Sequence, residues 1–139
     1  MAASLLPMRS WLFVPGDDDR KMAKAVDSAA DIVLFDLEDA VATEKKAIAR
    51  QTVCAVLKTR ADGHERLWVR VNPLDGSYTL DDLVAIMPER PGGIMLPKVH
   101  GRQDVERLDH YLSAFEAANG IAPGSTPVIA LVTETAQAM

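Results

Sequence analysis

Three carboxylates stand within four positions of the sequence, directly after an apolar run. Asp36, Glu38 and Asp39 follow the stretch 31–35, with only Leu37 between them. Like charges this close raise one another's pKa unless cations or hydrogen-bond donors compensate them, and such clusters suit metal or proton chemistry. A solvated loop whose aspartate caps the next helix has the same residue pattern. The spacing leaves a chemical site and a structural loop equally open.

Two cations follow other apolar runs. Arg70 lies at the end of the run 66–71, and its guanidinium is a rigid fork of donors that suits a substrate carboxylate or a developing oxyanion. An internal ion pair with the carboxylates at 36–39 is the structural alternative, and the two roles are compatible. Lys98 follows the run 93–96 and offers a second cation, although a lysine in such a place is usually solvated.

Glu134 adds a carboxylate after the last apolar run. It offers the hard oxygen that Mg²⁺ accepts, although one carboxylate does not make a metal site. Cys54 has no adjacent base and the histidines have no metal-ligand spacing, so we interpret all of them as structural or surface residues. The histidines are His64, His100 and His110.

These polar residues follow short β-rich runs that alternate with helical stretches. Such alternation is typical of parallel βαβ units, and apolar residues at successive positions indicate a sheet covered on both faces. The carboxyl ends of parallel strands meet at one edge of a sheet, where α/β enzymes place their active sites. We therefore expect the candidate residues to meet at this edge. The predicted strands are 11–14, 31–35, 66–71, 93–96 and 128–133.

Helical spacing of apolar residues fills the stretches between these strands. One stripe lies at 22–29 and another at 105–115, where Asn119-Gly120 supplies a helix end. The residue types of Trp11 and Phe13 predict core positions.

Two further helices are predicted between the strands. A helix over 44–58 is expected to bury a face that comprises Ile48, Ala55 and Val56. Thr79, three residues before Asp82, is expected to begin a short helix as its side-chain cap.

The composition excludes several classes of protein. A sequence of 139 residues with net charge −5 and 48% hydrophobic residues is typical of a globular domain, and its charge disfavours nucleic acid. The apolar runs are far shorter than the roughly 20 residues of a membrane-spanning helix, and no basic segment opens a secretory signal. One cysteine permits no intrachain disulfide, which fits a reducing compartment. We therefore expect a cytoplasmic protein without a membrane or nucleic-acid partner.

Six motifs, most of them at predicted strand ends, occur together in one order. In these motifs the chain resembles the HpcH/HpaI aldolase and citrate lyase beta-subunit family over essentially its whole length. The resemblance implies a (β/α)₈ TIM barrel that breaks or forms carbon–carbon bonds in 3-hydroxyacyl-CoA esters or related hydroxy acids, with Mg²⁺ as cofactor. The motifs are RSWLFVPG at 9–16, DLEDAV at 36–41, Lys46 with Arg50, RVN at 70–72, LPK at 96–98 and TETA at 133–136.

The resemblance implies a metal site. Glu134 corresponds to the glutamate that binds the metal, and the second ligand, an aspartate that ends the sixth strand, is expected beyond Met139. Glu38 and Asp39 correspond to acidic residues near the metal and its waters.

It also implies substrate contacts. Arg70 corresponds to the arginine that contacts the carboxylate or the reacting carbonyl oxygen of the substrate. Arg9, Lys24 and Lys98 fall in the region that meets coenzyme A or orients the site.

The resulting expectation is that residues 1–139 are the amino-terminal portion of a single barrel domain, with about five of its eight β/α units. The expected activity is cleavage of malyl-CoA, citramalyl-CoA or a citryl thioester of CoA or an acyl carrier, because the motif at 9–16 resembles the citrate-lyase-like branch. A pyruvate-type aldolase for free hydroxy acids and a non-catalytic half-barrel that binds a ligand or partner are the alternatives. By analogy we expect a homo-oligomer, a trimer or hexamer, and self-association of the isolated residues.

Overall fold

The computed structural model describes residues 7–60 and 64–138. Five parallel strands lie in one sheet in their order along the chain, as in the first five β/α units of a (β/α)₈ barrel. The strands are β1 (Trp11–Pro15), β2 (Ile32–Asp36), β3 (Leu67–Arg70), β4 (Gly93–Leu96) and β5 (Val128–Ala130). The α-helices are α1 (Asp19–Val26), α2 (Lys46–Lys58), α3 (Thr79–Ile86) and α4 (Arg102–Ala118). Single 3₁₀ turns lie at Thr43–Lys45, His64–Arg66, Met87–Glu89 and Ala136–Ala138.

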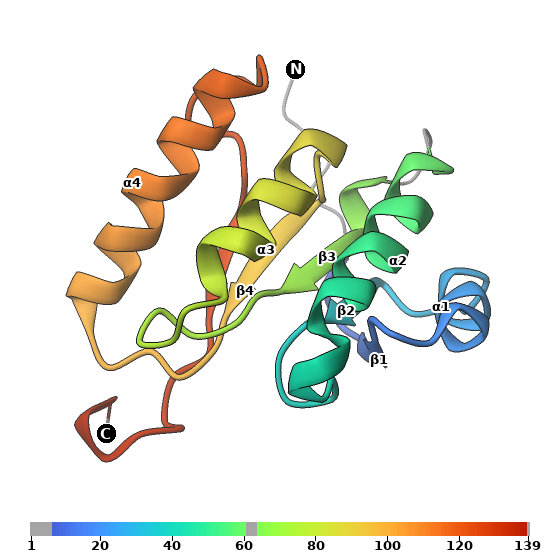
Figure 1. Ribbon diagram of the computed structural model, residues 1–139, viewed down its shortest axis with the longest axis horizontal. Coiled ribbons are helices and arrows are strands. Elements are labelled where there is room, and N and C mark those ends of the chain that lie inside the picture. Colours follow the sequence, from blue (N-terminus) through green and yellow to red (C-terminus); the bar gives the residue numbers. More distant parts are fainter. Residues whose placement is uncertain (1–6, 61–63, 139) are drawn as a thin grey trace.

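The helices pack along one face of the sheet, with α2, α3 and α4 side by side and α1 next to α2 (Figure 1). Alternate strand residues such as Val33, Phe35 and Val69 join the helices in the main core. The other alternate residues form a second cluster on the opposite face, which would line the barrel interior. That cluster comprises Ile32, Leu34, Trp68 and Met95, with Trp11 packed against it. The successive apolar positions therefore reflect two buried faces.

The carboxyl ends of the strands meet at one edge of the sheet, as predicted. The loops that lead into α2, α3 and α4 and the segment after β5 lie at this edge, at the bottom of Figure 1. The strand limits agree with the prediction within one residue, except that β5 ends at Ala130 rather than at 133. Thr133 adopts a left-handed conformation (φ 68°), which no extended strand can contain.

The face that α2 buries differs from the prediction, although Val56 is half-buried against the main core as expected. Ala49, Val53 and Leu57 are buried, together with Lys46, whereas Ile48 is 57% exposed and Ala55 is also exposed. Ile48 and Ala55 are seven residues apart, so they share a face, but it is the outer one. The buried face has its own apolar stripe at a spacing of four residues, and Lys46 on the same face contacts the loop after β2.

The helix at 79–86 is confirmed, but its predicted cap is wrong. The single Thr79 hydroxyl hydrogen is shared between the carbonyl oxygens of Asn72 (3.0 Å) and Pro73 (2.8 Å), and the hydroxyl does not cap the helix. In α4, Leu108 and Leu112 of the expected stripe are buried, and the predicted end is confirmed by Gly120 at φ 64°.

Phe13 is not a core residue. It lies on the face of β1 that looks into the barrel interior and is 46% exposed, and the guanidinium of Arg70 lies 4.9 Å from the centre of its ring. Trp11, on the same face, is half-buried and meets Trp68 edge to face at 5.1 Å. No helix in the described part of the chain has both the length and the apolar character needed to cross a bilayer.

Candidate functional site

Asp36 and Arg70 form the centre of the polar group at the carboxyl ends of the strands. They are partners in the register of β2 and β3, so both side chains emerge on the same face. Arg70 Nε and Nη2 donate to the two carboxylate oxygens of Asp36 at 2.8 and 2.6 Å, and Asp36 is 1% exposed. Burial alone would lower the pKa of Arg70, but the hydrogen bonds and charge of Asp36 outweigh it and raise that pKa. Arg70 is therefore a fixed cation.

The loop after β2 folds around the same aspartate. The backbone N–H groups of Glu38 and Ala40 donate to Asp36 Oδ1 (2.9 Å) and Oδ2 (3.0 Å). The Asp39 N–H donates to Glu38 Oε2 at 2.8 Å, which orients that carboxylate. Glu38 is 4% exposed and its Oε2 lies 3.7 Å from Arg70 Nη2. Asp36 thus connects Arg70 to the backbone of the loop after β2, which carries Glu38 and Asp39 and is called the acidic loop below.

Lys98 connects the acidic loop to β4. Its ammonium contacts Glu38 Oε1 at 2.7 Å and Asp39 Oδ1 at 3.2 Å. The hydrogen bond with Glu38 raises the pKa of Lys98, and the hydrogen bond from Lys98 lowers the pKa of Asp39. Lys98 is therefore not the solvated side chain that its position alone suggested.

Glu134 joins this group through the backbone of Lys98. The Lys98 N–H donates to Glu134 Oε2 at 2.7 Å. Lys98 and Thr133 both adopt left-handed conformations, at φ 52° and φ 68°, although neither is glycine. Such conformations cost about 1–3 kcal/mol each and cluster at functional sites. The strained backbone brings the ends of β4 and β5 together at the candidate residues.

The structure therefore brings together five of the six predicted site residues. These are Glu38, Asp39, Arg70, Lys98 and Glu134, linked by the distances above. With Asp36 the group carries two more negative than positive charges, which favours a divalent cation. Glu134 supplies the oxygen donor that suits Mg²⁺, which accepts one or two protein carboxylates and completes its shell with water and substrate. Within residues 7–60 and 64–138, no three His, Cys, Asp or Glu side chains form a metal-binding group, so the fit requires a further ligand.

Arg9 and Lys24 do not join the group. Arg9 precedes β1, at the amino-terminal ends of the strands, and its guanidinium pairs with Asp31 at 3.1 Å on the surface. Lys24 lies in the last turn of α1, beside Leu12 and Phe13.

A second polar layer lies behind the site and was not assigned a role from the sequence. Lys46, Arg50, Asn72 and Asp82 are connected by hydrogen bonds between α2, α3 and the end of β3. The available signal was the four-residue spacing of Lys46 and Arg50, which places two cations on one helix face. Their partners are 26 and 32 residues away, which no local pattern reveals.

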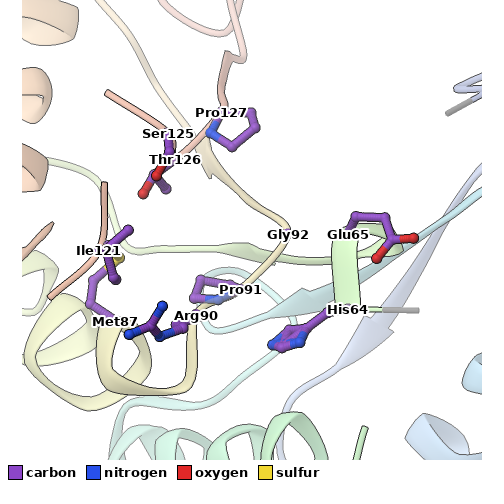
Figure 2. A pocket seen from close by; sticks show the side chains of 10 residues that line it. All are labelled: His64, Glu65, Met87, Arg90, Pro91, Gly92, Ile121, Ser125, Thr126 and Pro127. Atoms are coloured by element: carbon purple, nitrogen blue, oxygen red, sulfur yellow. The ribbon is translucent and has the colours of Figure 1, made fainter. Parts of the chain in front are cut away.

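A pocket of about 420 Å³ lies at the opposite edge of the sheet (Figure 2). Its lining precedes β3, β4 and β5, at His64, Gly92 and Pro127. Arg90 in this pocket donates to the carbonyl oxygens at the end of α4, and His64 Nε2 lies 3.0 Å from Glu89 O. These contacts tie loops together, far from the acidic group.

Cys54 is a structural residue, as predicted. Its thiol donates to Ala85 O at 3.0 Å between α2 and α3, and burial raises its pKa. A thiol with a raised pKa is a poor nucleophile.

Comparison with known proteins agrees with this geometry. The HpcH/HpaI aldolase/citrate lyase family matches residues 9–139. The chain is 40% identical over 108 residues to a (3S)-malyl-CoA thioesterase of Cereibacter sphaeroides, and this match covers 78% of the chain and 38% of that protein. It is 36% identical over 124 residues to the citrate lyase subunit beta of Haemophilus influenzae, with 89% of the chain and 43% of that protein covered.

A solved structure shows the same fold. The CitE protein of Mycobacterium tuberculosis, in complex with magnesium and acetoacetate, matches with a TM-score of 0.72 and 34% identity over 97% of the chain and 48% of that protein. The chain thus spans half or less of the length of these relatives. On the match over residues 9–139, the chain belongs to the HpcH/HpaI aldolase/citrate lyase family.

Proposed function

We propose that residues 1–139 are the amino-terminal portion of one (β/α)₈ barrel domain, and that the whole protein is a Mg²⁺-dependent carbon–carbon lyase for a 3-hydroxyacyl thioester. The observation that carries the proposal is the continuous polar group from Arg70 through Glu38 and Lys98 to Glu134. Relatives support the substrate class, since an L-malyl-CoA/beta-methylmalyl-CoA lyase of C. sphaeroides is 38% identical over 117 residues. The M. tuberculosis CitE protein has also been solved with magnesium, acetoacetate and coenzyme A.

Glu134 is the residue of this chain that would hold the metal, together with an acidic ligand from outside these residues. Bound there, Mg²⁺ would act as a Lewis acid and as a template for the carboxylate and carbonyl oxygens of the substrate. The orientation of Glu134 by the Lys98 N–H would fix its oxygens before the metal arrives.

Arg70 would stabilise the negative charge that develops when the carbon–carbon bond breaks. The electrons of the carbon–carbon bond pass to the acyl fragment, which becomes an enolate. The hydroxyl group loses its proton to a base and becomes a carbonyl. Asp36 occupies Nε and Nη2 of Arg70, and no residue in the described part of the chain receives a hydrogen bond from Nη1. Nη1 is therefore the donor we assign to the substrate. Removing one such partner typically lowers the rate about 10²- to 10³-fold.

Thioester hydrolysis is the second candidate function. The observation that favours it is the 40% identity to proteins named (3S)-malyl-CoA thioesterase. Both activities need the same recognition of a malyl thioester, and they differ in the bond that breaks.

The test is product analysis with the full-length protein and (3S)-malyl-CoA, with and without Mg²⁺. Formation of acetyl-CoA and glyoxylate supports the lyase, and formation of malate and free CoA supports the thioesterase. A protein that converts free hydroxy acids but no thioester supports the aldolase alternative. Citramalyl-CoA and citryl thioesters of CoA or a carrier then define the acyl group. No turnover of any of these substrates would overturn the proposal. The expected trimer or hexamer stays a prediction, which sedimentation of the same sample tests.

A further inference from the structure

Lys46 is a buried cation, and among residues 7–60 and 64–138 no carboxylate contacts its ammonium. The residue is 8% exposed, and Nζ lies within hydrogen-bond distance of Leu37 O (2.9 Å), Glu38 O (3.1 Å), Val41 O (3.4 Å) and Asn72 Oδ1 (2.8 Å). The ring of Tyr78 lies 5.5 Å away. Burying an ammonium costs several kcal/mol unless polar partners compensate it, and here four oxygen atoms do so. Three of these oxygens are backbone carbonyls of residues 37–41, so the charge of Lys46 is bound to the backbone of the loop after β2.

Asn72 holds Lys46 in place and shares one of its acceptors. Its Nδ2 donates to Leu37 O at 2.9 Å and to Asp82 Oδ2 at 2.7 Å. Asp82 also accepts from the Asn72 N–H (2.8 Å) and from Arg50 Nε (2.7 Å), and it is fully buried. The Leu37 carbonyl thus receives two donors that are themselves fixed from α2 and α3.

Two of the three carbonyls that Lys46 binds, those of Leu37 and Glu38, belong to the peptide units that shape the acidic loop. The Leu37 carbonyl shares a planar unit with the Glu38 N–H, which donates to Asp36 Oδ1. The Glu38 carbonyl shares a unit with the Asp39 N–H, which donates to Glu38 Oε2. Lys46 therefore holds two consecutive peptide planes from behind, while their N–H groups orient the carboxylates of Asp36 and Glu38 in the site.

We propose that Lys46 is a positioning residue, which fixes Glu38 and, through Asp36, Arg70 by holding the peptide planes after Leu37 and Glu38. Its catalytic consequence rests on the proposed function, whereas its effect on the loop does not. A displacement of about 1 Å in such a group lowers a rate by about 10².

The first experiment compares Lys46→Met with Lys45→Met, which removes an exposed neighbour whose partner is Asp17 at 3.7 Å. The measurement is NMR of the chain, with amide hydrogen exchange at Glu38 and Asp39 and the Nε–H resonance of Arg70, which Lys46 does not touch. In Lys46→Met we expect at least fivefold faster exchange at both amides and a shifted Arg70 resonance, with neither change in Lys45→Met. A smaller change in exchange, or an unshifted resonance, overturns the proposal. If Lys46→Met does not fold, Asn72→Ala replaces it, because this variant removes one of the two donors to Leu37 O. The same changes in amide exchange and in the Arg70 resonance are then required.

The second experiment measures kcat of the full-length protein. We expect Lys46→Met to lower kcat at least 30-fold at a temperature where circular dichroism shows it folded, and Lys45→Met to stay within twofold. A kcat near that of Lys45→Met overturns the proposal. An inactive wild-type protein would instead overturn the proposed function, and the NMR experiment alone would then decide the role of Lys46.

Discussion

At the residue scale, the pair of Asp36 and Arg70 joins stability to the candidate chemistry. The Arg70 side chain is 11% exposed, so loss of its partner leaves a buried charge uncompensated. We expect Asp36→Asn to lower the free energy of unfolding by about 3 kcal/mol, because breaking a buried pair costs far more than breaking one in water. Urea unfolding of the variant measures this difference.

A surface pair provides the matched control for Asp36→Asn. Arg102 and Glu106 lie one turn apart on α4 at 2.6 Å, and the Arg102 side chain is 89% exposed. Exposed pairs of this kind contribute about 0.5 kcal/mol or less, so Glu106→Gln should hardly change unfolding. An equal decrease in the free energy of unfolding in the two variants would show that burial does not make the ion pair of Asp36 more stabilising than an exposed pair.

The candidate residues could be predicted from their places after apolar runs, but their partners could not. Asp36 and Arg70 end β2 and β3, and Glu38 follows β2; the sequence reveals both strands, and parallel strands share their carboxyl edge. Lys46 with Arg50 is one of the sequence motifs, but its burial was not predicted, because lysine is normally exposed and its contacts with Leu37 and Asn72 are formed only in the fold. Contacts over such distances in the chain lie outside any periodicity.

At the element scale, the end of β2 depends on close approach of the loop after β1. The Gly16 N–H donates to Asp36 O at 2.9 Å, and a Cβ at Gly16 would lie 2.8 Å from that oxygen and 3.0 Å from Val53 Cγ2. We expect Gly16→Ala to lower the free energy of unfolding by about 1–3 kcal/mol, because overpacking shifts backbone at a buried site. Thermal unfolding of the chain gives the value.

Gly101 is the control for Gly16. It precedes α4 in an extended conformation (φ 173°), and no atom lies within 4 Å of a Cβ built there. Gly101→Ala meets no steric clash, and as an N-cap substitution it should lower the stability by less than about 1 kcal/mol. A Gly16→Ala variant as stable as Gly101→Ala would contradict the tight contact between Gly16 and the end of β2.

The connection from α4 to β5 gives a pH-dependent prediction. Glu116 is buried, and its carboxylate accepts the N–H groups of Gly124 (2.7 Å) and Thr126 (3.0 Å). Burial alone would raise the pKa of Glu116, but these hydrogen bonds lower it below the usual 4.5. The ionised carboxylate therefore stabilises the fold above pH 4.5, and this contribution is lost as the pH falls through the lowered pKa.

The variant Glu116→Ala tests this contribution. At pH 7 we expect it to reduce the free energy of unfolding by about 2 kcal/mol, the value of hydrogen bonds to a charged group. The difference from the wild type should shrink as the pH is lowered below 4.5. A difference that is constant between pH 7 and pH 3 would contradict the role of the charge.

The helices could be located from the sequence more reliably than their buried faces. Residues 44–58 contain no proline or glycine, which suffices to predict α2. Its apolar residues fall on more than one side, so Ile48 and Val53 compete for the core, and in the structure the side with Val53 faces the sheet. Packing against distant elements overrides a weak local pattern.

At the scale of the whole molecule, the described sheet has open edges at β1 and β5. Val128 and Ile129 of β5 are each 37% exposed, and Leu12 and Phe13 of β1 are exposed as well. Open apolar edges pair readily with other chains. We therefore expect the chain of 139 residues to self-associate, with an average mass that rises with concentration in sedimentation equilibrium.

Lysine substitutions show whether the edge of β5 carries this association. Ile129→Lys places a charge on that edge, which disfavours pairing between edges, so the variant should shift the association constant at least tenfold toward the 15.1 kDa monomer. Val84→Lys adds the same charge on the outer surface of α3, where Val84 is 59% exposed, and should leave association unchanged. Equal effects of the two variants would mean that net charge, and not the strand edge, controls association. A wild-type chain that is monomeric at all concentrations would contradict the argument from open edges.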